Sequence, residues 1–216
     1  MAERVNVYVD AFNLYYGALR RTPYRWLDLG KLCSLLLPRD EIHRIRYFTA
    51  RVRPLPHNPE QPIRQQVYLR AIMTIPNLSI HYGHYLTHTV RMPLASSMAK
   101  AEATKFPPQF VEVVKAEEKG SDVNLATYLI HDGHLGDYTT AVIVSNDSDL
   151  LEPIRIGRNE LGKSVGILNP YAQHPSKVLV REATFVKHIR PNVLRLSQFP
   201  NIMSDQHGTF HKPTAW

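Results

Sequence analysis

The stretch TTAVIVSNDSDLLEP, residues 139–153, joins an apolar strand to a helix through a turn that carries two aspartates. Its first half is a run of β-branched and small apolar residues, which is typical of a strand covered on both faces of a sheet. Pro153 is tolerated only near the start of a helix, so a helix is predicted to begin close to Asp149. A doubly buried strand followed directly by a helix favours an α/β fold.

The same alternation of strand and helix continues on both sides of this stretch. Strands are predicted at residues 4–10, 41–52 and 164–168, with a short edge segment at 185–189. Helices are predicted at residues 11–20, 27–37, 60–73, 121–133, 149–162 and 176–183, and we expect Gly133 to end the fourth of these. The predicted fold class is therefore α/β, a three-layer sandwich around a mostly parallel central sheet.

Three segments depart from this alternation. Residues 78–94 predict two short strands, which we expect to form a hairpin that extends the sheet. Residues 96–118 are rich in small and charged residues and contain two consecutive prolines, so we expect an inserted loop or short helix there. From residue 197 the chain is polar. We therefore predict one domain over residues 1–196 and an extended C-terminal tail over residues 197–216.

Composition narrows the class of partner. The chain carries 26 Lys and Arg against 19 Asp and Glu, a net charge of +7, which favours a polyanion because cations displace counterions from phosphates. Arginines that could flank a chain of phosphates are dispersed along the sequence, at positions 44, 46, 64, 70, 155 and 158. No apolar run approaches the ~20 residues that a membrane helix needs, and no secretory signal opens the chain. We expect a cytoplasmic protein without a membrane partner.

Aspartates from three distant segments are predicted to meet at one edge of the sheet. Asp10 ends the first strand, and Asp147 and Asp149 follow the strand of residues 139–145. The carboxyl ends of parallel strands share an edge, where such folds bind ligands. Asp122 lies on the same helical stripe as Leu125, a stripe that must face the sheet, so it should reach the same edge.

Four carboxylates in one place repel one another unless a cation compensates their charge. A hard divalent cation such as Mg²⁺ or Mn²⁺ prefers oxygen ligands and can activate water for attack on a phosphodiester. Each acid also has a structural explanation that remains open. Asp149 with Glu152 matches a capping box, and Asp122 behind a Ser121 cap would be favoured by the helix dipole.

Neighbouring polar and aromatic residues are candidates for binding substrate. Asn13 could orient water or a phosphate, or only bond the local backbone. Ser145 could contact a phosphate or cap the turn. Lys119 could bind a phosphate as a point charge, and Tyr16, in the aromatic cluster after Asp10, could stack on a base.

Three of the stretches already described resemble a known family. VYVDAFNLYYG, KGSDVNLATYLI and VIVSNDSDLLEPI, in this order, are similar to the three signatures of the NYN domain, in the LabA-like branch of the PIN-like nuclease superfamily. The resemblance extends from about residue 4 to about residue 190. It implies a PIN-like, Rossmann-like domain, a Mg²⁺ or Mn²⁺ site, and single-stranded RNA or a related nucleic acid as substrate.

Carried over by motif, the resemblance assigns residues to roles. Asp10 and Asn13 match the pair at the end of the first strand, and Asp122 matches the helix acid. Asp147 and Asp149 match the last cluster. One departure is Asn146, which stands where many members have glycine.

The function expected from these observations is that of a Mg²⁺- or Mn²⁺-dependent (endo)ribonuclease, with the choice between endonucleolytic and exonucleolytic cleavage left open. The alternative is a nucleic-acid-binding regulatory module of the same fold that cleaves weakly or not at all, because a fold does not establish turnover. A phosphatase with Asp10 as nucleophile is not favoured, since Phe12 stands where a second acid is needed. The tail and the predicted hairpin are surfaces through which a homodimer could form.

Overall fold

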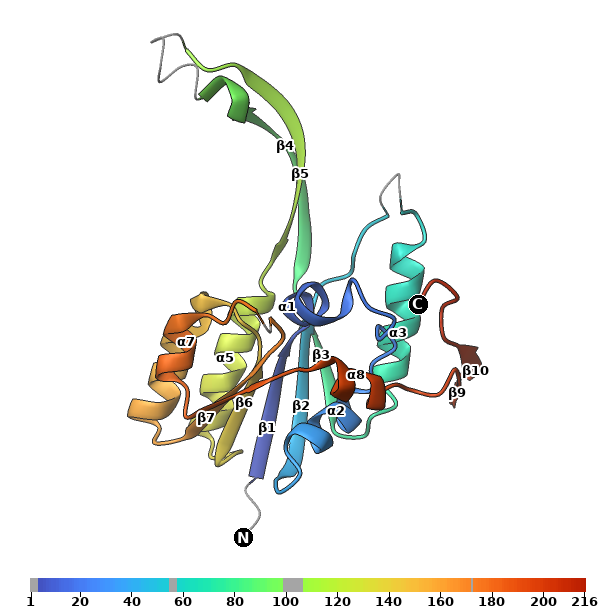
Figure 1. Ribbon diagram of the computed structural model, residues 1–216, viewed down its shortest axis with the longest axis vertical. Coiled ribbons are helices and arrows are strands. Elements are labelled where there is room, and N and C mark those ends of the chain that lie inside the picture. Colours follow the sequence, from blue (N-terminus) through green and yellow to red (C-terminus); the bar gives the residue numbers. More distant parts are fainter. Residues whose placement is uncertain (1–3, 55–57, 99–106, 172) are drawn as a thin grey trace.

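A six-stranded parallel sheet forms the centre of the computed structural model, which describes residues 4–54, 58–98, 107–171 and 173–216 (Figure 1). The strand order is β3-β2-β1-β6-β7-β8, and every neighbouring pair is parallel. The predicted α/β class is confirmed. The strands are β1 (Arg4–Asp10), β2 (Glu41–Thr49), β3 (Leu78–Tyr82), β6 (Thr140–Val144), β7 (Ser164–Asn169) and β8 (Phe185–His188).

Helices cover both faces of this sheet. Successive side chains of a strand point to opposite faces, so Val7 and Val9 of β1 pack in one core cluster and Tyr8 packs in the other. The first cluster includes residues of α1 (Ala11–Leu14), α2 (Leu29–Leu36), α3 (Gln61–Ile72) and α8 (Pro191–Leu196). The second includes residues of α5 (Ser121–His134), α6 (Leu151–Arg155) and α7 (Lys177–Glu182). The result is the predicted three-layer sandwich.

Short irregular turns extend two of these helices. A π-helical turn, η1 (Tyr15–Leu19), continues α1, and another, η3 (Ile156–Glu160), continues α6. A 3₁₀ turn, η2 (Ser148–Leu150), precedes α6. In the part of the chain that the structure describes, no helix has the length and apolar character needed to cross a membrane.

The strand order contains one reversal. The chain adds β2 and β3 on one side of β1, and later adds β6, β7 and β8 on its other side. The reversal therefore falls between β1 and β6. In open parallel sheets, a crevice for ligands opens beyond the carboxyl ends of the two strands at such a point.

A two-stranded ribbon projects from the body where a loop was expected (Figure 1). β5 (Phe110–Lys119) pairs antiparallel with β4 (His84–Pro93) along the full length of both strands. The expectation of a loop or short helix over residues 96–118 is therefore wrong for residues 110–118, and residues 99–106 lie outside the described residues. The two prolines precede β5 and do not interrupt it. The hairpin expected over residues 78–94 does not form, because β3 pairs with β2 in the central sheet and β4 pairs with β5 in the ribbon.

The segment after residue 197 also differs from the expected extended tail. It forms a hairpin of β9 (Ile202–Asp205) and β10 (Gly208–His211). Aromatic rings from this segment surround buried Trp26, with centroid distances of 5.8 Å to Phe199, 6.5 Å to Phe210 and 6.2 Å to Trp216. A few large rings bury much apolar area even where most neighbours are polar. The low number of apolar residues after residue 197 therefore led to the wrong prediction of an extended tail.

Helix α5 does not end at Gly133, as the sequence suggested. It continues to His134, and the turn with positive φ follows at Gly136, where φ is 69°. Gly133 lies inside the helix for a steric reason. A Cβ at this position would lie 2.5 Å from the hydroxyl of Tyr138.

Candidate metal centre

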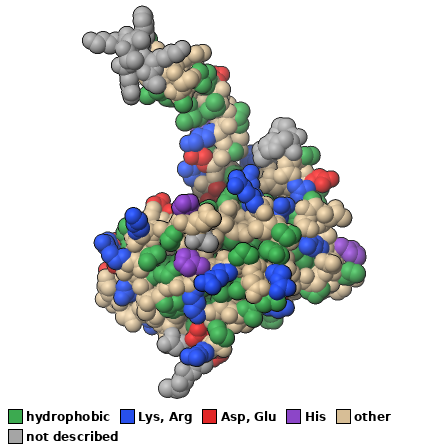
Figure 2. Space-filling model, viewed as in Figure 1, with side chains coloured by type: hydrophobic (Ala, Val, Ile, Leu, Met, Phe, Trp, Pro, Cys, Tyr) green, Lys and Arg blue, Asp and Glu red, His purple; other side chains and the backbone are tan. Residues whose placement is uncertain are grey.

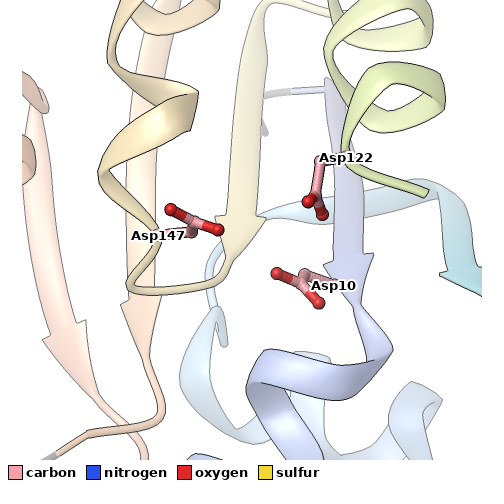
Figure 3. Close-up of side chains that lie close together, drawn as sticks. All are labelled: Asp10, Asp122 and Asp147. Atoms are coloured by element: carbon pink, nitrogen blue, oxygen red, sulfur yellow. The ribbon is translucent and has the colours of Figure 1, made fainter. Parts of the chain in front are cut away.

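Three aspartates from three elements meet at the crevice between β1 and β6. Asp10 is the last residue of β1, Asp122 the second residue of α5, and Asp147 lies in the loop after β6. One carboxylate oxygen from each lies within 4.8 Å of the others. Figure 3 shows the three side chains pointing toward one another. Of the four acids predicted to converge, these three do; we call them the acidic triad.

Local hydrogen bonds hold two of these carboxylates in place. Asp10 accepts from the backbone N–H of Asn13 at 2.9 Å and from the hydroxyl of Ser145 at 3.0 Å. Asp147 accepts from the backbone N–H of Asp149 at 3.0 Å, and its own N–H donates to Ser145 at 3.1 Å. Each carboxylate oxygen has two lone pairs, so these bonds leave acceptor capacity for a metal. Capping a helix and holding a metal are compatible here.

Electrostatics at the triad favour a bound cation. Burial raises the pKa of Asp10 to about 6, and the charges of Asp122 and Asp147 act in the same direction. The pKa of Asp122 is also raised, first by desolvation and then by Glu118, Asp147 and Asp149. Within the described residues, no Lys, Arg or His forms an ion pair with a triad carboxylate. A hard divalent cation would supply the missing positive charge.

Asp149 does not belong to the group that could hold one ion. Asp149 is exposed in the 3₁₀ turn that follows Asp147. Its backbone N–H donates to the carboxylate of Asp147. The capping-box interpretation of Asp149 is not what the structure has, because Asp147 caps the turn and α6 has no side-chain cap. The expected Ser121 cap differs too: Gly120 is the N-cap residue of α5, and Glu118 bonds the N–H and hydroxyl of Ser121.

The residues predicted to bind substrate are divided between the centre and the surface. Asn13 accepts from the N–H of Asn146 at 2.9 Å and so ties the two loops together. Ser145 is fully buried against Asp10. Tyr16 is 52% exposed and lines the cavity over the triad. Lys119 is not among the lining residues, and its ammonium lies 3.6 Å from the carboxylate of Glu117.

A cavity of about 370 Å³ opens over the triad. Its lining residues are Asp10, Phe12, Asn13, Tyr16, Tyr85, Ala116, Glu118, Ser121, Asp122, Asp147 and Tyr171. Four of them, Tyr85, Ala116, Glu118 and Tyr171, were missed by the sequence analysis. Glu118 directly precedes one of the quoted motifs, which was the available signal. Tyr85 reaches the cavity only through the register of the ribbon, which pairs it with Glu118.

Most arginines expected to flank phosphates are engaged elsewhere. Arg46 is buried and binds Asp132 through two nitrogens, at 2.7 and 2.8 Å. Arg44, Arg70 and Arg155 form ion pairs with Asp137, Asp205 and Glu182. On the face shown in Figure 2, the Lys and Arg side chains are scattered over the body and form no single patch. On this face the positive charge is therefore spread over the body.

Comparison with known proteins agrees with this geometry. The NYN domain family matches residues 4–190. Among characterised proteins, the 6-hydroxy-3-succinoylpyridine 3-monooxygenase HspA of Pseudomonas putida is 28% identical over 236 residues, which cover 99% of this chain and 75% of that protein. A protein of unknown function from Vibrio parahaemolyticus has the same fold, with a TM-score of 0.56 and 17% identity over 88% of this chain and 95% of that one. The family match spans most of the chain and all three triad residues, so this protein belongs to the NYN domain family.

Proposed function

We propose that this protein hydrolyses phosphodiester bonds in single-stranded RNA, with Mg²⁺ or Mn²⁺ held by Asp10, Asp122 and Asp147. The observation that carries the proposal is the acidic triad, whose carboxylates converge without a cationic partner among the described residues. Membership of the nuclease-like NYN family and the net charge of +7 support it.

Residues around the cavity would have separate roles in binding the ion and the RNA. The triad would hold the ion. Ser145 fixes the orientation of the Asp10 carboxylate, and the side chain of Asn13 fixes the loop after β6 by accepting from the N–H of Asn146. A divalent ion in such a place polarises a phosphodiester and lowers the pKa of bound water. Tyr16, Tyr85 and Tyr171 offer ring faces on which unpaired bases can stack. Stacking on single bases favours a single strand over a duplex.

Cleavage of end-labelled single-stranded RNA in Mn²⁺ tests this proposal. We expect Asp147→Asn to lower the rate by about 100-fold or more, because loss of a metal ligand costs at least as much as loss of a residue that supports one. Asp149→Asn is the matched control. It removes the same charge from an acid that lies two residues after Asp147 and outside the triad, so we expect activity close to that of the wild type.

Other outcomes would redirect or end the proposal. Equal cleavage by wild type and Asp147→Asn would assign the activity to another site or to a contaminant. Saturable binding of RNA without cleavage would identify a non-cleaving regulatory module. A single-stranded DNA of the same sequence, assayed in parallel, decides which nucleic acid is preferred.

A second candidate function comes from the relative in Pseudomonas putida. Its similarity extends over 99% of this chain, and its name describes monooxygenation of 6-hydroxy-3-succinoylpyridine at position 3. Such a reaction inserts one oxygen atom of O₂ and reduces the other to water with two electrons from a reductant. Incubating the protein with 6-hydroxy-3-succinoylpyridine, O₂ and reduced nicotinamide, with product detection by mass spectrometry, tests it directly.

A further inference from the structure

A second cavity adjoins the one over the triad. It encloses about 160 Å³, and Phe12 and Tyr16 line both cavities. Its wall comes from α1, η1, β2, α3, the loop residues Arg25, Val52 and Asn58, and Trp216. The lining residues are Ala11, Phe12, Tyr15, Tyr16, Leu19, Arg25, Tyr47, Thr49, Val52, Asn58, Gln61, Arg64, Gln65, Tyr68 and Trp216.

The volume and lining of this cavity suit one flat ring. Its wall contains the aromatic rings of Phe12, Tyr15, Tyr16, Tyr68 and Trp216, together with that of Tyr47. A cavity of about 150 Å³ is large enough to hold a benzene ring in a protein interior. Aromatic side chains bind planar rings by offset stacking and edge-to-face contact.

The same cavity presents a positive charge that lacks a counter-ion. Arg25 donates to the carbonyl of Ala215 at 3.2 Å, but it pairs with no carboxylate in the part of the chain that the structure describes. Its buried Nε also lacks an acceptor there. A partly buried guanidinium without a partner is costly, so an anion at this position would be favoured.

A neighbouring hydroxyl is also free to bind a ligand. Tyr47 is 7% exposed, and its hydroxyl makes no hydrogen bond with the described residues. Tyr47 pairs in the sheet with Val9, the residue before Asp10, so this cavity lies next to the triad. The cavity therefore combines aromatic faces, an uncompensated cation and a free hydroxyl beside the metal centre.

We propose that this second cavity binds one nucleotide of the RNA, with its base among the aromatic rings and its phosphate at Arg25, next to the nucleotide whose phosphodiester lies at the triad. This inference rests on the proposed function and adds a specificity pocket to it. The recognised chemistry is a planar heteroaromatic ring that bears an anionic group.

Intrinsic fluorescence reports occupancy of this cavity directly. The chain has two tryptophans: Trp216 lines the cavity, and Trp26 packs against it at 6.2 Å. We expect a nucleoside 5′-monophosphate, titrated in EDTA so that the metal centre plays no part, to change the emission saturably. The matching nucleoside, which lacks the phosphate, should bind at least about 10-fold more weakly, since a hydrogen bond to a charged group is worth roughly 1.5–3 kcal/mol.

Variants separate this cavity from the metal centre. Arg25→Gln should weaken the monophosphate at least about 10-fold, while Arg39→Gln, an exposed arginine outside the lining residues, should leave binding unchanged. Tyr47→Phe removes only the free hydroxyl, and it should weaken binding without lowering the unfolding temperature. Asp147→Asn should bind the monophosphate as the wild type does even when it no longer cleaves RNA.

The proposal fails if the monophosphate gives no saturable change, or if both Arg25→Gln and Tyr47→Phe bind it as tightly as the wild type. Pyridine-3-carboxylate, which also joins a ring to an anion, is the third ligand in the titration. Binding of this acid without binding of any nucleotide would overturn the assignment of a nucleotide to the cavity. Saturable binding of the monophosphate by a wild type that does not cleave RNA would count against the proposed function alone.

Discussion

Asp10 is a buried acid whose ionisation opposes folding. Its pKa rises from 3.8 to about 6 in the folded protein, chiefly through burial and then through the neighbouring carboxylates. Between these values the folded chain keeps a proton that the unfolded chain has released. The free energy of unfolding therefore falls as pH rises through this window, and a shift of about two units corresponds to roughly 3 kcal/mol.

We expect the metal-free wild type to lose stability from about pH 4 to about pH 6 more steeply than Asp10→Asn. The amide can still accept from the N–H of Asn13, so the turn should persist. Urea unfolding at several pH values in EDTA measures the difference. Parallel pH profiles for the two proteins would show that this carboxyl does not titrate in that window.

Helix α5 shows how an element is constrained by its packing. A glycine within a helix costs up to about 1 kcal/mol relative to alanine, so propensity alone favours Gly133→Ala in the last turn of α5. The new Cβ would lie 2.5 Å from the Tyr138 hydroxyl and 2.9 Å from the side chain of Leu161. Overpacking of this kind costs about 1–3 kcal/mol.

The overlap should outweigh the gain in propensity, so Gly133→Ala is predicted to lower the free energy of unfolding by up to about 2 kcal/mol. Chemical denaturation measures the change. Val123→Ala alters the same helix at a position that is 68% exposed, and it should change stability by no more than about 0.5 kcal/mol. A stabilised Gly133→Ala would mean that the Tyr138 ring moves freely.

The elements that carry the triad were predictable because their signals are local. A β-branched run that ends in an acid places Asp10 and Asp147 at the carboxyl edge, whatever the rest of the chain does. The apolar stripe of α5 carries Asp122 to the same edge. The sequence could not separate Asp147 from Asp149, because their spacing fits either role and only the 3₁₀ turn directs them differently.

Features that depend on contacts between residues far apart in the chain could not be predicted from the sequence. Glu118 and Tyr85 enter the cavity because β4 and β5 align in one register, and no local pattern specifies that register. The packing of Trp216 against Trp26 likewise joins the two ends of the described chain. A single sequence reports which residues are apolar, but not which distant partners they meet.

At the scale of the whole molecule, the β4–β5 ribbon is the least integrated part. Neither core cluster contains a buried residue from it, and it exposes several large apolar side chains. These are Leu86, Met92, Phe110 and Val114. An isolated two-stranded hairpin is only marginally stable in water. The homodimer expected through the tail and a hairpin stays a prediction; the tail packs on its own body, so the ribbon is the remaining surface for it.

We predict that replacing residues 88–115 with a short Asn-Gly turn leaves the unfolding temperature within a few degrees of the wild type, because the core loses nothing. Differential scanning calorimetry measures this. Sedimentation of both proteins tests the homodimer, since a dimer that forms through the ribbon should become a monomer on shortening. A large fall in unfolding temperature would show that the ribbon supports the body.

The root of the ribbon lies directly beside the metal ligands. There Gly83 is pressed against the backbone of Lys119, and Gly120 adopts a φ of 92° just before Ser121 and Asp122. The carboxylate of Glu118 accepts hydrogen bonds from the N–H and the hydroxyl of Ser121. The ribbon is thus joined through Glu118 to Ser121, the residue next to one ligand of the triad. A molecule bound along the described part of β4 or β5 would lie against a strand that is hydrogen-bonded beside the metal centre, without entering either cavity.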